Sequence, residues 1–129
     1  KRYKSDLSII FFDINSFKVI NDSLGHHLGD EVLVKISNVI EKNIRSIDSL
    51  GRWGGDEFLI ILPQTNLSQT KNIISHLEKQ LTKIQYSKSI NVTCSFGIAS
   101  CEQNDTLDSL LKKADESMYE EKTRLKIKS

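Results

Sequence analysis

A pair of glycines followed by two acidic residues and an apolar run constrains the fold of this chain more than any other feature. The stretch Arg52–Phe58 has the sequence RWGGDEF, and the apolar run Leu59–Pro63 follows it directly. Adjacent glycines permit a tight chain reversal, because neither carries a steric penalty at positive φ. The apolar run predicts a strand that is buried on both faces. We therefore expect a β-hairpin whose tip presents Asp56 and Glu57.

Two interpretations of these acidic residues are open from this stretch alone. Carboxylates held at the edge of a buried strand are costly unless a metal ion or a lysine meets their charge. A polar hairpin tip that simply faces water needs no such partner.

Length and composition exclude several classes of protein. The chain has 129 residues, of which 38% are hydrophobic and 27% charged, and this fits one globular domain with a single core. A formal net charge of +1 favours neither nucleic acid nor a membrane surface as a partner, so any phosphate must bind at a local site. Cys94 and Cys101 are too far apart along an extended backbone to bridge. Reduced thiols favour a cytoplasmic location, which leaves membrane attachment of a longer parent open.

Hydrophobic periodicity predicts the elements of the first half of the chain. The continuous apolar run Leu7–Phe12 is typical of a central strand, and it ends at Asp13, where open α/β sheets tend to place chemistry. Residues 25–30 are expected to form a loop. An apolar stripe from Val32 to Ile44 predicts a helix that begins at Glu31.

The second half of the chain completes a recognisable order of elements. Residues 73–84 predict an amphipathic helix, Ile90–Ala99 alternates with period two as in a strand with one face in the core, and a further helix is expected from Asp105. The order β-α-β-β-α-β with a terminal helix is the split βαβ pattern of ferredoxin-like folds. We therefore predict an α+β fold in which helices cover one face of a mainly antiparallel sheet.

In such a fold the end of the first strand lies beside the hairpin tip. Asp13, Asp56 and Glu57 can then converge, and oxygen ligands without nearby His or Cys favour Mg²⁺ or Mn²⁺ together with phosphate oxygens. Lys18 follows closely and can neutralise charge on a phosphoryl group. The constellation indicates two-metal nucleotidyl transfer on a palm-like sheet.

Several separated motifs occur together at spacings familiar from one protein family. They are Phe12–Asp22, Gly25–His26, Gly29–Asp30, Arg52–Phe58, Ser95–Ala99, Lys113–Asp115, Met118–Tyr119 and Lys122. Together they resemble the GGDEF family of diguanylate cyclases. The resemblance implies condensation of two GTP into cyclic di-GMP and pyrophosphate, in a site between two domains of a homodimer that each hold one GTP. The alternative is a catalytically silent domain that binds GTP or cyclic di-GMP and regulates an attached domain.

The resemblance also assigns roles around the metal. Asp13 and Asp56 would bind it by carboxylate and Ile14 by its backbone carbonyl, with Glu57 assisting and two Mg²⁺ or Mn²⁺ ions in each GTP site. Asp56 would also act as general base on the attacking 3′-hydroxyl, and Lys18 would stabilise the transition state.

Further residues are assigned to the nucleotide. Asn21 and Asp30 would hydrogen-bond the edge of guanine, with His26 beside the nucleotide. Lys122 and Lys126 would hold the terminal phosphates. Each has a plainer interpretation, such as a helix cap for Asp30, a turn residue for Asn21, a loop residue for His26 and a solvated lysine for Lys122.

Arg45 and Asp48 lie where the family places an inhibitory site for its product. A guanidinium and a carboxylate would hold cyclic di-GMP there, whereas the plainer interpretation is an ordinary charged pair. His76 stands where relatives often add an arginine.

Three departures from the family pattern are visible. Asn15 replaces a common second Asp, and Leu125–Ile127 replaces a carboxyl-terminal Gly-Arg-Asn or Gly-Lys-Asn. The family's amino-terminal signature is absent, so we expect residues 1–129 to be a GGDEF domain that lacks its first segment and comes from a larger protein.

Overall fold

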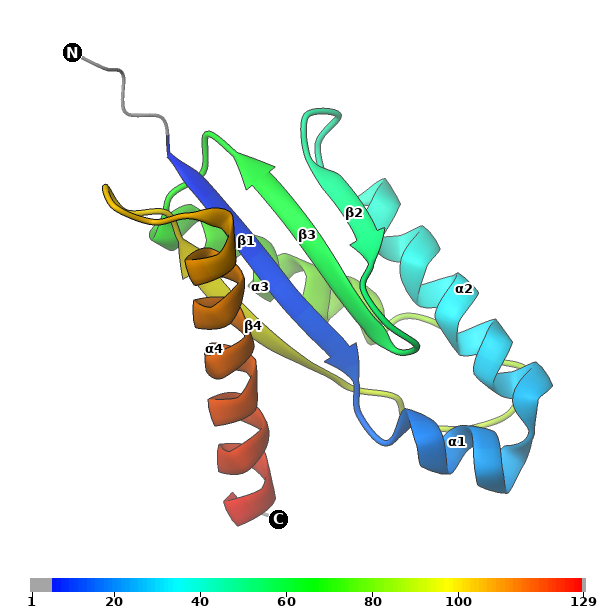
Figure 1. The fold of residues 1–129 in the computed structure, drawn as a ribbon. Helices are drawn as coiled ribbons and strands as arrows, with labels where there is room; N and C mark the ends of the chain where they lie inside the picture. Colours follow the sequence, from blue (N-terminus) through cyan, green and yellow to red (C-terminus); the bar gives the residue numbers. More distant parts are fainter. Residues whose placement is uncertain (1–5, 129) are drawn as a thin grey trace.

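The computed structural model describes residues 6–128 of the chain and shows one sheet with helices on both of its faces (Figure 1). The elements, in chain order, are β1 (Leu7–Ile14), α1 (Phe17–Leu24), α2 (His26–Lys42), β2 (Ser49–Arg52), β3 (Glu57–Pro63), α3 (Leu67–Leu81), β4 (Cys94–Ser100) and α4 (Leu107–Lys128). The strand order is β2-β3-β1-β4, and every neighbouring pair is antiparallel. The predicted α+β class and ferredoxin-like order are confirmed, with α1 as an additional helix.

The core occupies both faces of β1, so the prediction that helices cover one face of the sheet is wrong. Ile10, Phe12 and Ile14 pack on one face with β3, α2 and α3. Ile9 and Phe11 pack on the other face against α4, which Figure 1 shows in front of the sheet while α3 lies behind it. The reason is that β1 is apolar at successive positions, and each apolar face needs a layer to cover it.

Strand β3 is less enclosed than predicted. Phe58, Ile60 and Leu62 are buried, whereas Leu59 and Ile61 on the opposite face are half-buried. Helix α4 packs on β4 and β1, and this leaves the same face of β3 partly open.

Helix α4 approaches β4 very closely at Gly97. A Cβ placed there would lie 2.0 Å from the Ala114 carbonyl oxygen and 2.4 Å from the Met118 nitrogen. The outer N–H groups of this edge strand are capped from α4: Phe96 N–H donates to Glu121 Oε1 (2.5 Å) and Ile98 N–H to Ser117 Oγ (3.0 Å). Helix α4 therefore protects the edge of the sheet as well as its face.

Residues 25–30 do not form the expected loop. Gly25, at φ 97°, separates α1 from α2, and α2 begins at His26. The helix starts earlier than predicted because Leu28 is already buried one turn before Val32 and extends the apolar stripe. Asp30 thus lies inside α2, and the interpretation of Asp30 as a helix cap is wrong.

The strand predicted from Ile90 begins only at Cys94. Cys94 pairs with Ile14, the last residue of β1, so residues before it have no partner strand. Ile90 and Val92 nevertheless pack on the core as irregular chain. The alternation of apolar and polar residues before Cys94 therefore reflects side-chain burial, and these residues are not paired with another strand.

The hairpin tip forms without positive φ at Gly54 or Gly55, contrary to the expectation from the sequence. Within residues 6–128, Gly25 is the glycine with that conformation. The N–H groups of Trp53 and Gly54 both donate to Glu57 O (2.7 and 3.2 Å). The Arg52 guanidinium donates to the carbonyls of both glycines, at 2.6 to 3.2 Å, and so holds the turn together.

None of the helices in the described part of the chain combines the length and the apolar character needed to cross a membrane.

Candidate active site

Asp13 lies at the centre of a row of polar residues across one end of the sheet. In the strand register it faces Glu57 of β3 on one side and Ser95 of β4 on the other. Directly opposed residues of antiparallel strands project to the same face, so these side chains share the face that α4 covers. The hairpin tip joins the row because Ile14 N–H donates to Asp56 O (3.2 Å). The structure thus brings Asp13, Asp56 and Glu57 together, and we call these three residues the acidic row.

The Asp13 carboxylate is buried, with 4% of the residue exposed. Its Oδ2 accepts a hydrogen bond from Lys122 Nζ of α4, and the two groups form an ion pair. Its Oδ1 is buried without a hydrogen-bond partner among the described residues. A buried oxygen of this kind carries a desolvation cost that a bound cation would remove.

Electrostatics at this site follow from burial and from the crowding of acids. Burial raises the pKa of Asp13, Lys122 opposes that effect, and the charges of Asp56 and Asp115 raise the pKa further. The pKa of Glu57 is also raised, first by burial and then by Asp56 and Asp13. Like charges that raise one another's pKa indicate a place where positive charge is favourable.

A cavity of about 570 Å³ opens beside these acids. It is lined by Asp13, Glu57, Asp115, Glu116, Met118, Tyr119, Glu120 and Lys122. Asp115, Glu116 and Glu120 were not assigned a function from the sequence, and acids recurring along α4 near Lys122 are the signal that could have drawn attention to them. Asp115 belonged to a family motif but carried no role there.

The acids fit a hard cation by their chemistry, since all the available donors are oxygens. Within residues 6–128, no group of three or more His, Cys, Asp or Glu side chains is already gathered as a metal site. Asp13 and its neighbours therefore offer carboxylates and one unpartnered oxygen, without a complete set of ligands held in place.

The residues assigned to guanine lie on α1 and α2, beyond the end of β1. Asn21 Oδ1 would lie 1.8 Å from a Cβ at Gly29, so the Asn21 amide rests against the helix backbone next to Asp30. Asn21 thus lies against Gly29, the residue before Asp30 in the chain, and Asp30 is exposed and available to a ligand. His26 and Lys18 are exposed in the first turns of α2 and α1, respectively. Lys126 lies outside the residues whose side chains are described.

Arg45 and Asp48 lie at the other end of the sheet. The Arg45 guanidinium binds Asp48 through two hydrogen bonds (2.8 and 3.0 Å) and also donates to Pro63 O and Thr65 Oγ1 (3.0 and 2.6 Å). Pro63 ends β3, whereas Glu57 begins it, so roughly 20 Å of strand separates this pair from the acids. The hydrogen bonds to Asp48 raise the pKa of Arg45, which keeps the guanidinium charged.

A separate cavity of about 260 Å³ lies beside Arg45 and Asp48 and reaches to α3. His76 Nε2 lies 3.0 Å from Asn43 Oδ1, and Asn43 lines this cavity. Arg45 and Asp48 lie away from the hairpin tip, as predicted, because Arg45 contacts Pro63 at the opposite end of β3.

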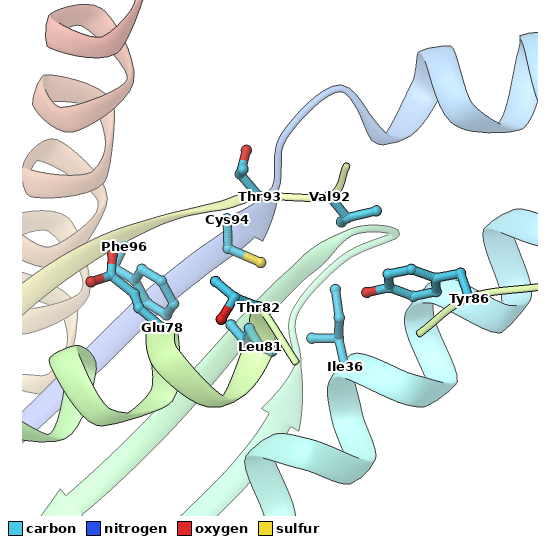
Figure 2. A pocket seen from close by; sticks show the side chains of 9 residues that line it. All are labelled: Ile36, Glu78, Leu81, Thr82, Tyr86, Val92, Thr93, Cys94 and Phe96. Carbon is cyan, nitrogen blue, oxygen red and sulfur yellow. The ribbon is translucent and has the colours of Figure 1, made fainter. Parts of the chain in front are cut away.

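A third cavity, of about 270 Å³, lies between α2, α3 and the chain that leads into β4 (Figure 2). Its walls are mostly apolar, and the Cys94 sulfur points into it. Burial raises the pKa of the Cys94 thiol to about 12, so this group is protonated and unreactive at neutral pH.

Comparisons with known proteins agree with this geometry. A family model described as the GGDEF domain of diguanylate cyclases matches residues 1–127. The chain is 36% identical over 117 residues to the diguanylate cyclase DgcM of Escherichia coli, and 37% identical over 122 residues to the response regulator PleD of Caulobacter vibrioides. These matches cover 91% and 90% of this chain but only 28% and 27% of the two relatives, so the chain spans less than a third of either.

A solved structure has the same fold. It is the active GGEEF domain of a diguanylate cyclase from Vibrio cholerae, which matches with a TM-score of 0.86 and 27% identity over 92% of this chain and 78% of that one. Because the family match extends over nearly all of the sequence, the chain belongs to the GGDEF-domain family of diguanylate cyclases.

Proposed function

We propose that this chain is an active diguanylate cyclase domain, which works as a pair of facing copies that each hold one GTP. The 3′-hydroxyl of each GTP attacks the α-phosphate of the other. Each attack forms one phosphodiester bond and breaks the bond to the β-phosphate, so two pyrophosphates leave and cyclic di-GMP remains. The observation that carries this proposal is the convergence of Asp13, Asp56 and Glu57 at one sheet end.

The acidic row is the proposed place for two Mg²⁺ or Mn²⁺ ions. Asp13 and Asp56 would hold them by carboxylate and Ile14 by its carbonyl, with Glu57 assisting. Such ions neutralise phosphate charge and make a bound hydroxyl more acidic when they are present. The unpartnered Asp13 Oδ1 and the raised pKa values of Asp13 and Glu57 support this assignment.

The protein groups then divide the remaining tasks. Asp56, at the hairpin tip, accepts the proton of the 3′-hydroxyl, and Lys18 meets the charge that develops on the transferring phosphoryl group. Lys122 borders the 570 Å³ cavity with a partly exposed side chain, which supports a role in holding the leaving phosphates. Lys126 has the same proposed role.

Guanine would bind at Asn21 and Asp30, with His26 beside it. An acceptor carboxylate suits the N1–H and exocyclic amine of guanine, and an amide supplies both a donor and an acceptor. The Asn21 amide lies against Gly29, which precedes Asp30 in α2, and this supports a shared site.

Arg45 and Asp48 are the proposed inhibitory site for cyclic di-GMP. Their distance from the acidic row means that product bound there would not compete for the GTP pocket. Inhibition would instead act by fixing two domains in an arrangement that keeps the hydroxyl from the phosphate.

The test is turnover of GTP with Mg²⁺, followed by chromatography of the nucleotides and by release of pyrophosphate. It is run on the chain alone and on the chain fused to a dimeric coiled coil, because the reaction needs two facing sites. We expect cyclic di-GMP from the fused protein and none from a fused Asp56→Ala variant. Saturable GTP binding without turnover in the fused protein would instead support a silent regulatory domain.

A further inference from the structure

Asn15, one of the residues at which this chain departs from the family pattern, forms three hydrogen bonds with the start of β4 and the residue before it. Its backbone N–H donates to Thr93 O (2.8 Å), and its Nδ2 donates to Thr93 Oγ1 (2.9 Å). Its Oδ1 accepts from Ser95 Oγ (2.8 Å). One amide thus uses a donor and an acceptor at the same time, as a carboxylate cannot.

Asn15 lies just beyond the end of the hydrogen-bonded ladder. The ladder between β1 and β4 ends at the pair Ile14–Cys94. Immediately afterwards the chain reverses into α1 through Ser16, whose φ is 59°, a conformation that residues other than glycine rarely adopt. The bonds of Asn15 therefore hold the strand end at the point where it would otherwise fray.

The same bonds lie directly beside Asp13 in the sheet. Ser95 is fully buried and stands directly opposite Asp13 in the register, so Asp13, Asn15 and Ser95 lie on one face at adjacent positions. Figure 2 shows the Thr93 hydroxyl directed away from the cavity that the Cys94 sulfur faces, and this hydroxyl accepts the hydrogen bond from Asn15.

We propose that Asn15, through Thr93 and Ser95, is a positioning residue that fixes the Asp13 carboxylate and the Ile14 carbonyl for cation binding. Its side-chain amide is engaged by Thr93 and Ser95, so it would act through them and not as a ligand. This inference rests on the proposed function, because it presumes that the acidic row binds a metal ion. Outer residues that orient metal ligands typically change metal affinity 10- to 100-fold when they are replaced.

Two substitutions at Asn15 separate the effect of losing the hydrogen bonds from the effect of adding a charge. Asn15→Leu has a similar size and loses both side-chain hydrogen bonds. Asn15→Asp keeps the hydrogen bond from Ser95. It also keeps a hydrogen bond with Thr93 when the Thr93 hydroxyl rotates to donate. In addition, it places one more negative charge near Asp13. A merely structural role would make both variants less stable without weakening the Mn²⁺ affinity of folded Asn15→Leu.

The probe is Mn²⁺, titrated by electron paramagnetic resonance into the full chain with a saturating GTP analogue whose α–β bridge is methylene and cannot be cleaved. We expect Asn15→Leu to bind Mn²⁺ about tenfold more weakly than wild type, and Asn15→Asp to bind at least as tightly. Thr93→Val, at an exposed position, should weaken binding in the same direction and serves if Asn15→Leu does not fold. Thr82→Val is the matched control, since among the described residues its hydroxyl bonds Lys79 O alone (2.7 Å), and it should bind like wild type.

A second readout is the Mg²⁺ dependence of turnover in the dimeric fusion. The loss in Asn15→Leu should lie mainly in the KM for Mg²⁺ and be recovered largely at high Mg²⁺. Wild-type Mn²⁺ affinity in folded Asn15→Leu and Thr93→Val, while wild type itself binds the ion, would overturn this inference alone. No Mn²⁺ binding by wild type would overturn the proposed metal site and this inference together.

Discussion

Lys122, near the end of α4, pairs with the buried carboxylate of Asp13, which precedes it by 109 residues. The pair ties the terminal helix to the end of the central strand. It also favours the ionised form of Asp13, because Lys122 opposes the effect of burial on the pKa of Asp13.

Replacing Lys122 with Met should therefore destabilise the fold by roughly 1–3 kcal/mol near neutral pH, because a buried carboxylate loses its partner while the side-chain stem is kept. Lys112→Met, at an exposed position of the same helix, should change stability by less than about 0.5 kcal/mol. Urea denaturation of both variants measures the difference. Equal stability of the two variants would show that the pair contributes nothing.

The loss in Lys122→Met should depend on pH in a defined direction. The pKa of Asp13 is raised in the folded protein, so ionising this group costs stability as the pH rises through that folded value. Without Lys122 the folded pKa rises further. The stability difference between variant and wild type should thus be smallest below the ordinary Asp value of 3.8 and should open as the pH rises through the two folded pKa values. A difference that shrinks with rising pH would contradict this account.

Gly97→Ala should be strongly destabilising, by about 3 kcal/mol or more, because the new methyl group would lie 2.0 Å from a backbone oxygen of α4 and the helix would have to shift away from β4. Gly51→Ala is the control, since a Cβ at Gly51 has no atom within 4 Å. Chemical denaturation should separate the two variants clearly. Movement of α4 would also displace Lys122, so the pH dependence of Gly97→Ala should resemble that of Lys122→Met.

Gly29→Ala should reduce guanine recognition with little loss of stability. Its methyl group would meet the end of the flexible Asn21 side chain, at 1.8 Å, and displace the amide from its position beside α2. We expect Gly29→Ala and Asn21→Ala to lose GTP affinity by about tenfold or more and ATP affinity much less, because a site that loses its hydrogen-bonding partner loses discrimination. Titration with both nucleotides checks this, and equal losses for GTP and ATP would contradict the assignment. Asp30→Ala needs no correction for a lost helix cap, since Asp30 lies within α2.

Arg45→Ala should remove product inhibition without lowering the initial rate, because Arg45 lies at the far end of β3 from the acidic row. The same change leaves the buried Asp48 carboxylate without its main partner and should cost about 1–3 kcal/mol of stability. Initial rates and inhibition by added cyclic di-GMP are measured well below the melting temperature of the variant. Inhibition of undiminished strength in Arg45→Ala would show that product binds elsewhere.

The sequence by itself determined the class of fold and which acidic residues meet at one end of the sheet. Apolar periodicity identified β1, β3 and the two amphipathic helices α2 and α3, because hydrophobic burial imposes a repeat that can be read locally. Asp13 and Glu57 were predicted to meet because both lie next to strand ends whose pairing follows from the order of elements. Asn21 and Asp30 were matched to guanine by motif alone.

Only the tertiary structure decided the features that depend on distant neighbours. The partner of Asp13 on α4, the missing ladder before Cys94 and the close approach at Gly97 all come from segments far apart in the chain. The second covered face of β1 likewise follows from where α4 packs and not from any local pattern. Periodicity records that a side chain is buried, but the packing of the whole sheet decides what buries it, and so decides which acid gains a lysine and which strand end is held by Asn15.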